Sequence, residues 1–356
     1  MLAAAPRIDA RLLWAAIVVL VATFAALPVL LSHDVYSYVD YARLGAVHDL
    51  DPYVHPPAAV PTDPAFAEVE WVDTTSAYGP LFTLATYPLA LLPVGGAVLA
   101  LKLLAALSVL ALAAIVGRIA AIRGVHPTRA AAFVALNPLV LVHVVGGAHN
   151  DGLTMALAML GVAAVLVARE LSGGVLLVAA IAVKSSAALL APFALLATLR
   201  PTGRIRPNRG RSRPVGRLAL GAAGAAAVGG TAAWFAFGWD WLGAFDLAGE
   251  NQGRTSHMSI PITTARLTGL DPGATRIAAA SLYAALVLYL FAWTWRNGDW
   301  IRAAAWATLG ILLATSWLLP WYLIWLLPLA AISRDRPLQL LTLALTAYQL
   351  GTRIPL

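Results

Sequence analysis

"LLWAAIVVLVATFAALPVLLSHDVYSYVDY", residues 12–41, decides the fold class of this 356-residue chain. Its first part, residues 12–31, is apolar and has the length of about 20 residues that a helix needs to cross the hydrocarbon core of a bilayer. No small-residue cleavage pattern precedes His33, so we interpret residues 12–31 as an uncleaved transmembrane helix and not as a signal peptide. Aspartates and tyrosines follow this segment at once.

The same apolar character recurs along the whole chain. Hydrophobic residues make up 60% of the sequence and charged residues only 12%, and this composition is typical of a polytopic membrane protein. Cysteine is absent, which excludes disulfides and thiolate metal sites. We predict one all-α membrane domain over residues 1–356, with about 10–11 transmembrane helices. The apolar segments are residues 12–31, 97–117, 130–146, 152–168, 173–183, 187–199, 218–238, 276–295, 303–319, 321–332 and 337–352.

Three regions of the chain do not have the pattern of a single transmembrane helix. Segments 173–183 and 187–199 read as two half-length helices that meet at "VKSSA", and Pro320 divides the last third of the chain in the same way. The stretch "YGPLFTLATYPLALLPV", residues 78–94, contains several prolines and aromatic ends. We predict that it forms an interfacial helix in the first outer loop and does not cross the membrane.

Charge distribution predicts the orientation of the chain. With a cytoplasmic N-terminus, most of the 24 basic residues fall in inside loops and most of the 17 acidic residues fall outside. Residues 32–78 and 239–275 are then the first and second extracytoplasmic loops of a multi-pass plasma membrane protein. Residues 200–217 form a basic cytoplasmic loop, which we interpret as a topology signal beside membrane lipids and not as a nucleic-acid site.

Asp34 is the first candidate functional residue. A carboxylate at the hydrocarbon boundary is costly to bury, although an aspartate that merely ends a transmembrane helix is common. Asp34 belongs to a cluster with Tyr36, Tyr38, Asp40 and Tyr41. The cluster favours a functional site at Asp34 over an aspartate that only ends the helix.

A second polar cluster, "GGAHND", precedes the fourth apolar segment. One of its residues is explained by capping of the following helix, and the structural interpretation is a capped turn with solvated neighbours. The functional interpretation is that His149, Asn150 and Asp151 face the same cavity as Asp34. No zinc pattern is present, and a hard divalent cation such as Mg²⁺ or Mn²⁺, with Asp151 as ligand, is the only metal that the sequence leaves open.

Two lysines lie inside apolar segments. Lys184 stands at the junction of the half-length helices, where it either snorkels to the interface or contacts a phosphate together with backbone N–H groups and serine hydroxyls. Lys102 leaves the same two interpretations open. Trp71, Trp239 and Trp241 are candidates for an acceptor groove, or members of an interfacial aromatic belt.

These motifs resemble the GT-C glycosyltransferases, membrane enzymes that use polyprenyl-phosphate sugars. The segments "HDVYSYVDYARLG", "DPYVHPP", "SAYGPL", "LNPLVLVHVVGGAHNDGLTMALAMLGVAA" and "LPWYLIWLLP" look like the actinobacterial polyprenol-phosphate-mannose-dependent α-1,6-mannosyltransferase family. The resemblance implies an inverting transfer of mannose to a mannan or lipid-linked glycan at the outer face. It implies no required cofactor, since a phosphomonoester leaving group carries less charge than a nucleotide diphosphate.

The resemblance and ordinary chemistry together assign expected roles. Asp34 matches the family's catalytic position and serves as general base for the acceptor hydroxyl. Lys184, with Arg254 and Arg266 of the second outer loop, is expected to bind the donor phosphate. The remaining candidates for donor and sugar contacts are His149, Asn150, Asp151, Tyr36, Tyr78, Trp321 and Tyr322.

Other functions remain open at this point. A polyprenyl-phosphate-dependent arabinofuranosyl- or glucosyltransferase would require similar residues. Broken helices beside a lysine also suit a lipid or sugar transporter or a flippase. A transporter should place its ionisable residues near mid-bilayer and show an internal repeat, whereas these residues gather toward the outer side and no repeat is evident.

Overall fold

The computed structural model describes residues 9–199, 214–250 and 253–352, and throughout these ranges every regular element is a helix. This confirms the all-α prediction. Most of the predicted basic loop, residues 200–213, lies outside the described residues. In the first half of the chain the elements are α1 (Ala10–Ala26), α2 (Asp34–Ala46), η1 (Pro57–Ala59), η2 (Phe66–Glu68), α3 (Pro80–Thr86), η3 (Tyr87–Leu91), α4 (Val94–Ile122), α5 (Pro127–Ala135), η4 (Val140–Gly146), α6 (Asp151–Leu166), α7 (Glu170–Val183), η5 (Ser185–Leu190) and α8 (Ala191–Leu199).

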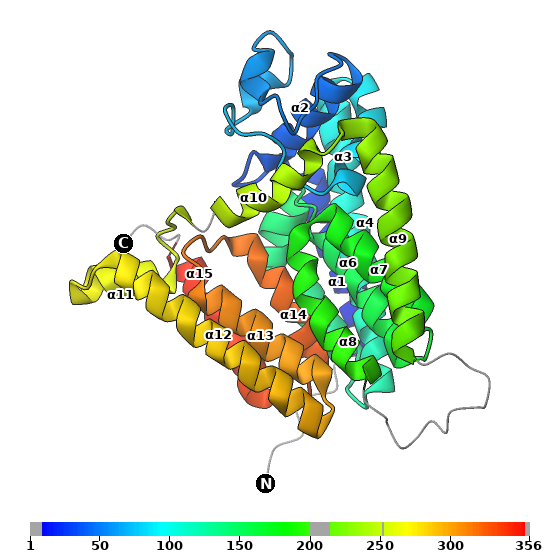
Figure 1. The fold of residues 1–356 in the computed structure, drawn as a ribbon, viewed down its shortest axis with the longest axis vertical. Helices are drawn as coiled ribbons and strands as arrows, with labels where there is room; N and C mark the ends of the chain where they lie inside the picture. The colour runs from blue at the N-terminus through cyan, green and yellow to red at the C-terminus, as the bar shows by residue number, and fades with distance from the viewer. Residues whose placement is uncertain (1–8, 200–213, 251–252, 353–356) are drawn as a thin grey trace.

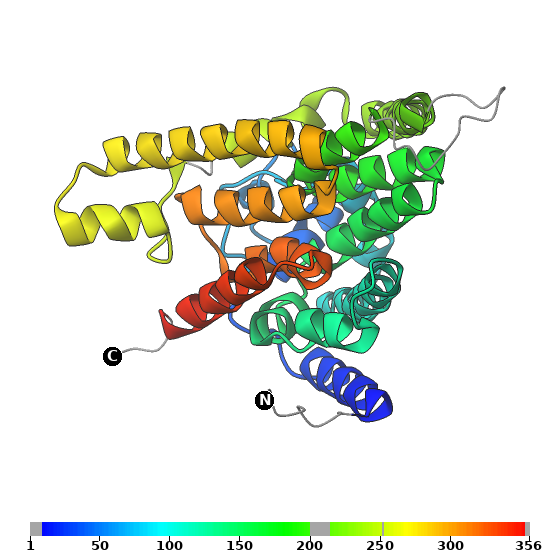
Figure 2. The same ribbon diagram turned by 90° about the horizontal axis from the view of Figure 1, so that it is seen from below.

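The second half of the chain adds one helix, residues 214–237, that packs on α7, and a group of helices that leans against the first half (Figures 1 and 2). Within it, α14 contacts α4, α5 and α6, so it joins the two halves. Its residues are apolar on every face, which is typical of a helix buried all round. These elements are α9 (Pro214–Phe237), η6 (Asp240–Leu242), α10 (Gly243–Glu250), α11 (Ile260–Thr268), α12 (Pro272–Asn297), α13 (Trp300–Ala314), η8 (Pro320–Tyr322), α14 (Leu323–Ile332) and α15 (Arg336–Gly351).

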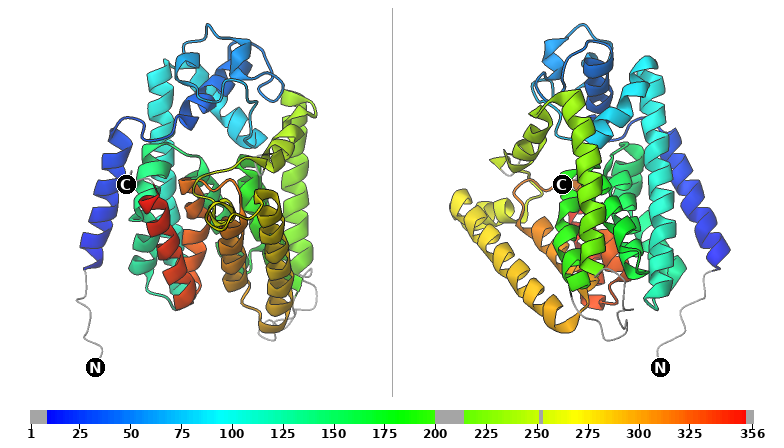
Figure 3. Two further views of the ribbon diagram at one scale, coloured as in Figure 1. Left: turned by 90° about the vertical axis from the view of Figure 1, so that its left-hand side faces the viewer. Right: turned by 45° about the vertical axis from the view of Figure 1, so that its right-hand side comes forward.

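Residues 32–93, which we call the cap, cover one end of the helical bundle (Figures 1 and 3). The cap contains α2, α3 and the short helices between and after them. The predicted helix in residues 78–94 is therefore present, as α3 followed by η3. Gly79 fixes the cap to the bundle, because its N–H donates to the carbonyl of Val183 at 3.0 Å and a Cβ there would lie 2.1 Å from the carbonyl oxygen of Ala182.

The number of transmembrane helices stays a prediction. Within the described ranges, α4, α9 and α12 are long and apolar enough to cross a bilayer, and α5 with η4 adds a fourth if this bent pair is one span. Seven further apolar helices are shorter than 18 residues. Hydropathy predicts about 10–11 spans, but it does not show where an apolar segment is interrupted by a break in the helix.

Several predicted segments have different bounds in the structure, and two of these differences have a clear local cause. The first apolar segment is helical only to Ala26, because Pro28 lacks an N–H to continue the helix. Segment 130–146 is not one helix: it is broken at Asn137 and bent by 66°. Asn137 precedes Pro138, whose ring disfavours the helical conformation of the residue before it, and the Asn137 side chain accepts the N–H of Leu139 at 3.0 Å.

Small residues let the helices of the bundle approach closely. A Cβ on Gly174 of α7 would lie 2.1 Å from the Leu218 carbonyl oxygen of α9, and one on Gly221 of α9 would lie 2.0 Å from the Leu171 carbonyl oxygen. Backbone contacts of this kind are the main way in which membrane helices associate without large side chains. They fix α7, whose end carries Lys184, against α9.

Candidate active site

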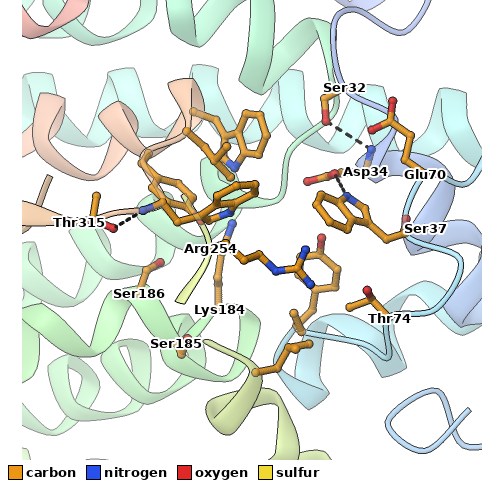
Figure 4. Close-up of a pocket in the computed structure, with 18 of the residues that line it drawn as sticks. Ser32, Asp34, Ser37, Glu70, Thr74, Lys184, Ser185, Ser186, Arg254 and Thr315 are labelled. Carbon is orange, nitrogen blue, oxygen red and sulfur yellow. Dashed lines mark hydrogen bonds between the residues drawn. The ribbon is translucent and has the colours of Figure 1, made fainter. Parts of the chain in front are cut away.

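A cavity of about 400 Å³ lies between the cap and the bundle (Figure 4). Its walls come from the start of α2, the cap loop before Gly79, the junction of α7 and η5, residue 254 and the segment from α13 to α14. Ionisable or aromatic side chains form much of the lining. They are Asp34, Tyr41, Glu70, Trp71, Tyr78, Lys184, Arg254, Trp317, Trp321, Tyr322 and Trp325.

Asp34 is the first residue of α2, and its carboxylate faces the cavity with 13% of the side chain exposed. The indole N–H of Trp71 donates to Asp34 Oδ1 at 3.1 Å. The other oxygen, Oδ2, lies 3.6 Å from Nδ1 of the buried His149. Burial raises the pKa of Asp34, and the nearby positive charge of Lys184 opposes that rise. The carboxyl is thus oriented by one firm hydrogen bond and poised to accept a proton.

Lys184 lies where the predicted half-length helices meet. It has extended backbone angles between α7 and η5, and its ammonium donates to Asp151 Oδ2 at 2.8 Å. The other Asp151 oxygen accepts the indole N–H of Trp325 at 2.7 Å. Since an ammonium has three N–H donors and Asp151 uses one, Lys184 can also donate into the cavity that it lines.

Two stacked pairs of aromatic rings lie beside these charged groups. His149 stacks on Trp321 with ring centroids 3.9 Å apart, and Tyr322 stacks on Trp325 at 4.2 Å. The Lys184 ammonium lies over the Tyr322 ring at 5.8 Å from its centroid, within the range of a cation–π contact. The stacked rings hold His149 in a fixed orientation beside Asp34.

The segment between α10 and α11 supplies another cation. The guanidinium of Arg254 lies 5.0 Å from the ring centroid of Trp71, and its side chain extends into the space between Lys184 and Asp34 (Figure 4). Arg254 is exposed, and its contact with Trp71 joins the segment between α10 and α11 to the cap. A cation in this position is accessible to an anion that enters the cavity.

The structure brings most of the predicted residues together. Asp34, Lys184, Arg254, Tyr78, Trp321 and Tyr322 line the cavity. His149, Asn150 and Asp151 lie behind its wall, where Asn150 is buried and its side-chain amide has no hydrogen-bond partner among the described residues. Tyr36 packs beside His33 and Arg266 is exposed on α11, and neither lines the cavity.

Three of the ionisable or aromatic cavity residues were not found from the sequence: Glu70, Trp317 and Trp325. Trp317 and Trp325 belong to the segment around Pro320, in which only Trp321 and Tyr322 were predicted from the sequence. Of the other tryptophans considered, Trp71 lines the cavity. Trp239 is 69% exposed, and Trp241 packs against a separate cluster around Tyr53.

Comparison with known proteins identifies the family of this chain. Residues 1–200 match a protein family described as alpha-(1->6)-mannopyranosyltransferase, N-terminal domain. The chain belongs to this alpha-(1->6)-mannopyranosyltransferase family. It is 33% identical over 328 residues to alpha-(1->6)-mannopyranosyltransferase A of Mycobacterium tuberculosis, an alignment that covers 84% of this chain and 61% of that protein.

A second member of the mannopyranosyltransferase family is similar over a shorter stretch. The chain is 31% identical over 232 residues to alpha-(1->6)-mannopyranosyltransferase A of Corynebacterium glutamicum, covering 62% of this chain and 46% of that protein. The chain therefore spans about 61% of the length of the mycobacterial relative. No solved structure matches it.

Asp40 provides a contrast within the helix that carries Asp34 in this mannopyranosyltransferase-family chain. It is buried, neither carboxylate oxygen has a hydrogen-bond partner within the described ranges, and it does not line the cavity. Burial, together with the negative charge of Asp63, raises the pKa of Asp40 from 3.8 to about 7. The folded state thus holds the Asp40 proton more tightly than the unfolded state does.

We expect Asp40 to make stability depend on pH. Because the folded pKa is the higher one, its contribution is full below pH 3.8 and is lost as the pH rises to about 7. Asp40→Asn should flatten this dependence and raise the unfolding midpoint at pH 8 by roughly 2 °C or more. Thermal unfolding of the detergent-purified protein between pH 4 and pH 8 measures it. An unchanged pH dependence in the variant would contradict the assignment.

Proposed function

We propose that this protein transfers mannose from a polyprenyl-phosphate donor to a hydroxyl of a mannan or lipid-linked glycan, forming an α-1,6 linkage at the outer face of the membrane. One observation carries the proposal: the Asp34 carboxylate and the Lys184 ammonium line the same cavity. A base for an alcohol and a cation for a phosphate are the two groups that this reaction needs. Membership of the mannopyranosyltransferase family supports mannose as the sugar.

The cavity supports a single displacement with inversion. The oxygen of the acceptor hydroxyl forms a bond to C1 of mannose while Asp34 accepts the proton of that hydroxyl. The bond between C1 and the phosphate oxygen breaks, and the electron pair leaves with the polyprenyl phosphate. The β-linked donor thereby yields an α-linked product. Lys184 and Arg254 stabilise the negative charge that develops on the departing phosphate.

The position of the cavity supports an extracytoplasmic reaction. It lies under the cap, at one end of a bundle whose long helices are apolar. The ion pairs Arg123–Asp299 and Arg302–Asp335 join helix ends on the side away from the cap. With the charge distribution of the loops, this arrangement favours an outer cap and a cytoplasmic N-terminus in the plasma membrane.

A transfer assay tests the donor and the sugar together. Membranes containing the protein are incubated with radiolabelled polyprenyl-phosphate mannose and a short α-mannoside acceptor. The expected result is a lengthened mannoside that is sensitive to an α-1,6-mannosidase. Parallel reactions with polyprenyl-phosphate arabinofuranose and glucose serve as controls. Transfer from either of these but not from the mannose donor would overturn the sugar assignment.

We expect transfer to persist in EDTA. Both oxygens of Asp151, the candidate metal ligand, already accept hydrogen bonds from Lys184 and Trp325. In the part of the chain that the structure describes, no three carboxylate or imidazole groups are placed to share a cation. The rate is therefore expected to stay within about twofold in excess chelator, with added Mg²⁺ or Mn²⁺ as the comparison. Loss of transfer that Mg²⁺ restores would contradict this proposal.

A further inference from the structure

Lys102 is a buried cation outside the cavity. It lies on α4, its side chain is 3% exposed, and its ammonium donates to the carbonyl oxygens of Leu27, Pro28 at 2.9 Å and Gly146 at 3.2 Å. These three acceptors use all three N–H donors of the group. Lys102 therefore does not extend to the membrane surface, one of the two interpretations that the sequence left open.

The carbonyls that Lys102 binds belong to the two segments that lead into the site. Leu27 and Pro28 follow the end of α1 and precede Asp34 in the chain. Gly146 ends η4 and precedes His149. The N–H of Leu30 also donates to the Gly146 carbonyl at 3.2 Å, so the two segments contact each other where Lys102 meets them.

Each of these segments contains a strained residue between its Lys102 contact and the site. Leu31 has φ 58° and Ala148 has φ 56°, a left-handed backbone conformation that residues other than glycine rarely adopt. Such strain persists only where surrounding contacts hold it. Leu31 lies three positions before Asp34, and Ala148 directly precedes His149.

We infer that Lys102 is a positioning residue that clamps these two turns together and so sets Asp34 beside His149. The inference rests on the proposed role of Asp34 as base. Lys102 itself does not line the cavity and would not touch a substrate. Its ammonium instead substitutes for the helical hydrogen bonds that the carbonyls after α1 lack.

The rate of disulfide formation between the two turns tests the clamp without an assay of enzymatic activity. A Cβ on Gly146 would lie 3.3 Å from that of Leu30, close to the separation of about 3.5–4.5 Å across a disulfide. The sequence has no cysteine, so in Leu30→Cys/Gly146→Cys both thiols are the introduced ones. The full-length protein is oxidised in detergent, and free thiols are counted with a maleimide polymer. We expect cross-linking to be several-fold slower when Lys102→Met is added, and equal rates would overturn the inference.

Rescue of activity provides the second measurement. Lys102→Met is expected to lower kcat by about 10²-fold with little change in the donor KM, because displaced catalytic groups slow the chemical step. The 30–146 disulfide should restore kcat in Lys102→Met, and a reductant should remove that gain. The cysteine pair with Lys102 intact, oxidised and reduced, is the control. A slow variant that the disulfide does not rescue would overturn the positioning role.

These outcomes separate the inference from the proposed function. If the unmodified protein transfers no mannose, the proposed function fails, while the cross-linking rates still test the clamp. If Lys102→Met does not yield folded protein, Lys102→Gln, which keeps two N–H donors, takes its place in both experiments. The shorter, uncharged glutamine can bind at most two of the three carbonyls, so cross-linking should again be slower than with Lys102, and equal rates would overturn the clamp.

Discussion

Asp34→Asn should lower kcat for mannose transfer by about 10²–10⁴-fold, the contribution typical of a general base. The amide has nearly the shape of the carboxylate and can still accept the Trp71 N–H through its oxygen. It cannot take a proton from the acceptor hydroxyl. Initial rates with polyprenyl-phosphate mannose, at several concentrations of donor and acceptor, separate kcat from KM.

Asp40→Asn is the matched control for this variant. Both aspartates lie on α2 and both variants replace a carboxyl group by an amide, but Asp40 does not line the cavity. Its transfer rate should stay close to that of the unmodified protein. Equal losses in the two variants would indicate that any change in α2 disturbs the cap. Full activity in Asp34→Asn would remove Asp34 from the role of base.

Asp34 and Lys184 could be predicted as functional residues because isolated charges in apolar sequence have few stable environments. Both residues interrupt or directly follow apolar segments. Placing a charge there costs free energy, so such a residue is expected to have an ionic partner or a function. The structure places both on one cavity, 150 positions apart in the chain. Their catalytic roles remain proposals.

The partners of these charges could not be predicted in the same way. Trp325 lies within an apolar segment, where a tryptophan at a membrane interface is ordinary. Its significance comes from the hydrogen bond to Asp151, and no local pattern indicates which indole reaches a carboxylate 174 positions away. Glu70 lies in an irregular part of the cap, where neither helical nor strand periodicity indicates the direction of a side chain.

The helix break at Asn137 is different, because its signal was present in the sequence. Pro138 follows Asn137, and the residue before a proline disfavours the helical conformation. Hydropathy alone merged the two sides into segment 130–146. The π-helix η4 after the break depends on tertiary contacts, among them the Lys102 bond to Gly146. That part of the local structure could not be derived from the segment alone.

Lys184→Met is expected to lose both stability and transfer. Asp151 is fully buried and would keep only its hydrogen bond from Trp325, so an unpaired charge would remain in the interior. Breaking a buried ion pair in this way costs about 3–5 kcal/mol. The donor phosphate would also lose its cation, for which we expect a fall in kcat/KM of about 10²-fold or more. Thermal unfolding and transfer assays measure the two losses separately.

The double variant Lys184→Met/Asp151→Asn distinguishes a structural from a catalytic role. Removing the Asp151 charge relieves the unpaired carboxylate, and the oxygen of the introduced amide can still accept the Trp325 N–H. We therefore expect most of the stability to return. Transfer should remain low, because no ammonium faces the phosphate, whereas Lys184→Arg should retain part of the rate. If the double variant regains transfer along with stability, Lys184 serves only to neutralise Asp151, and Arg254 becomes the cation that the phosphate requires.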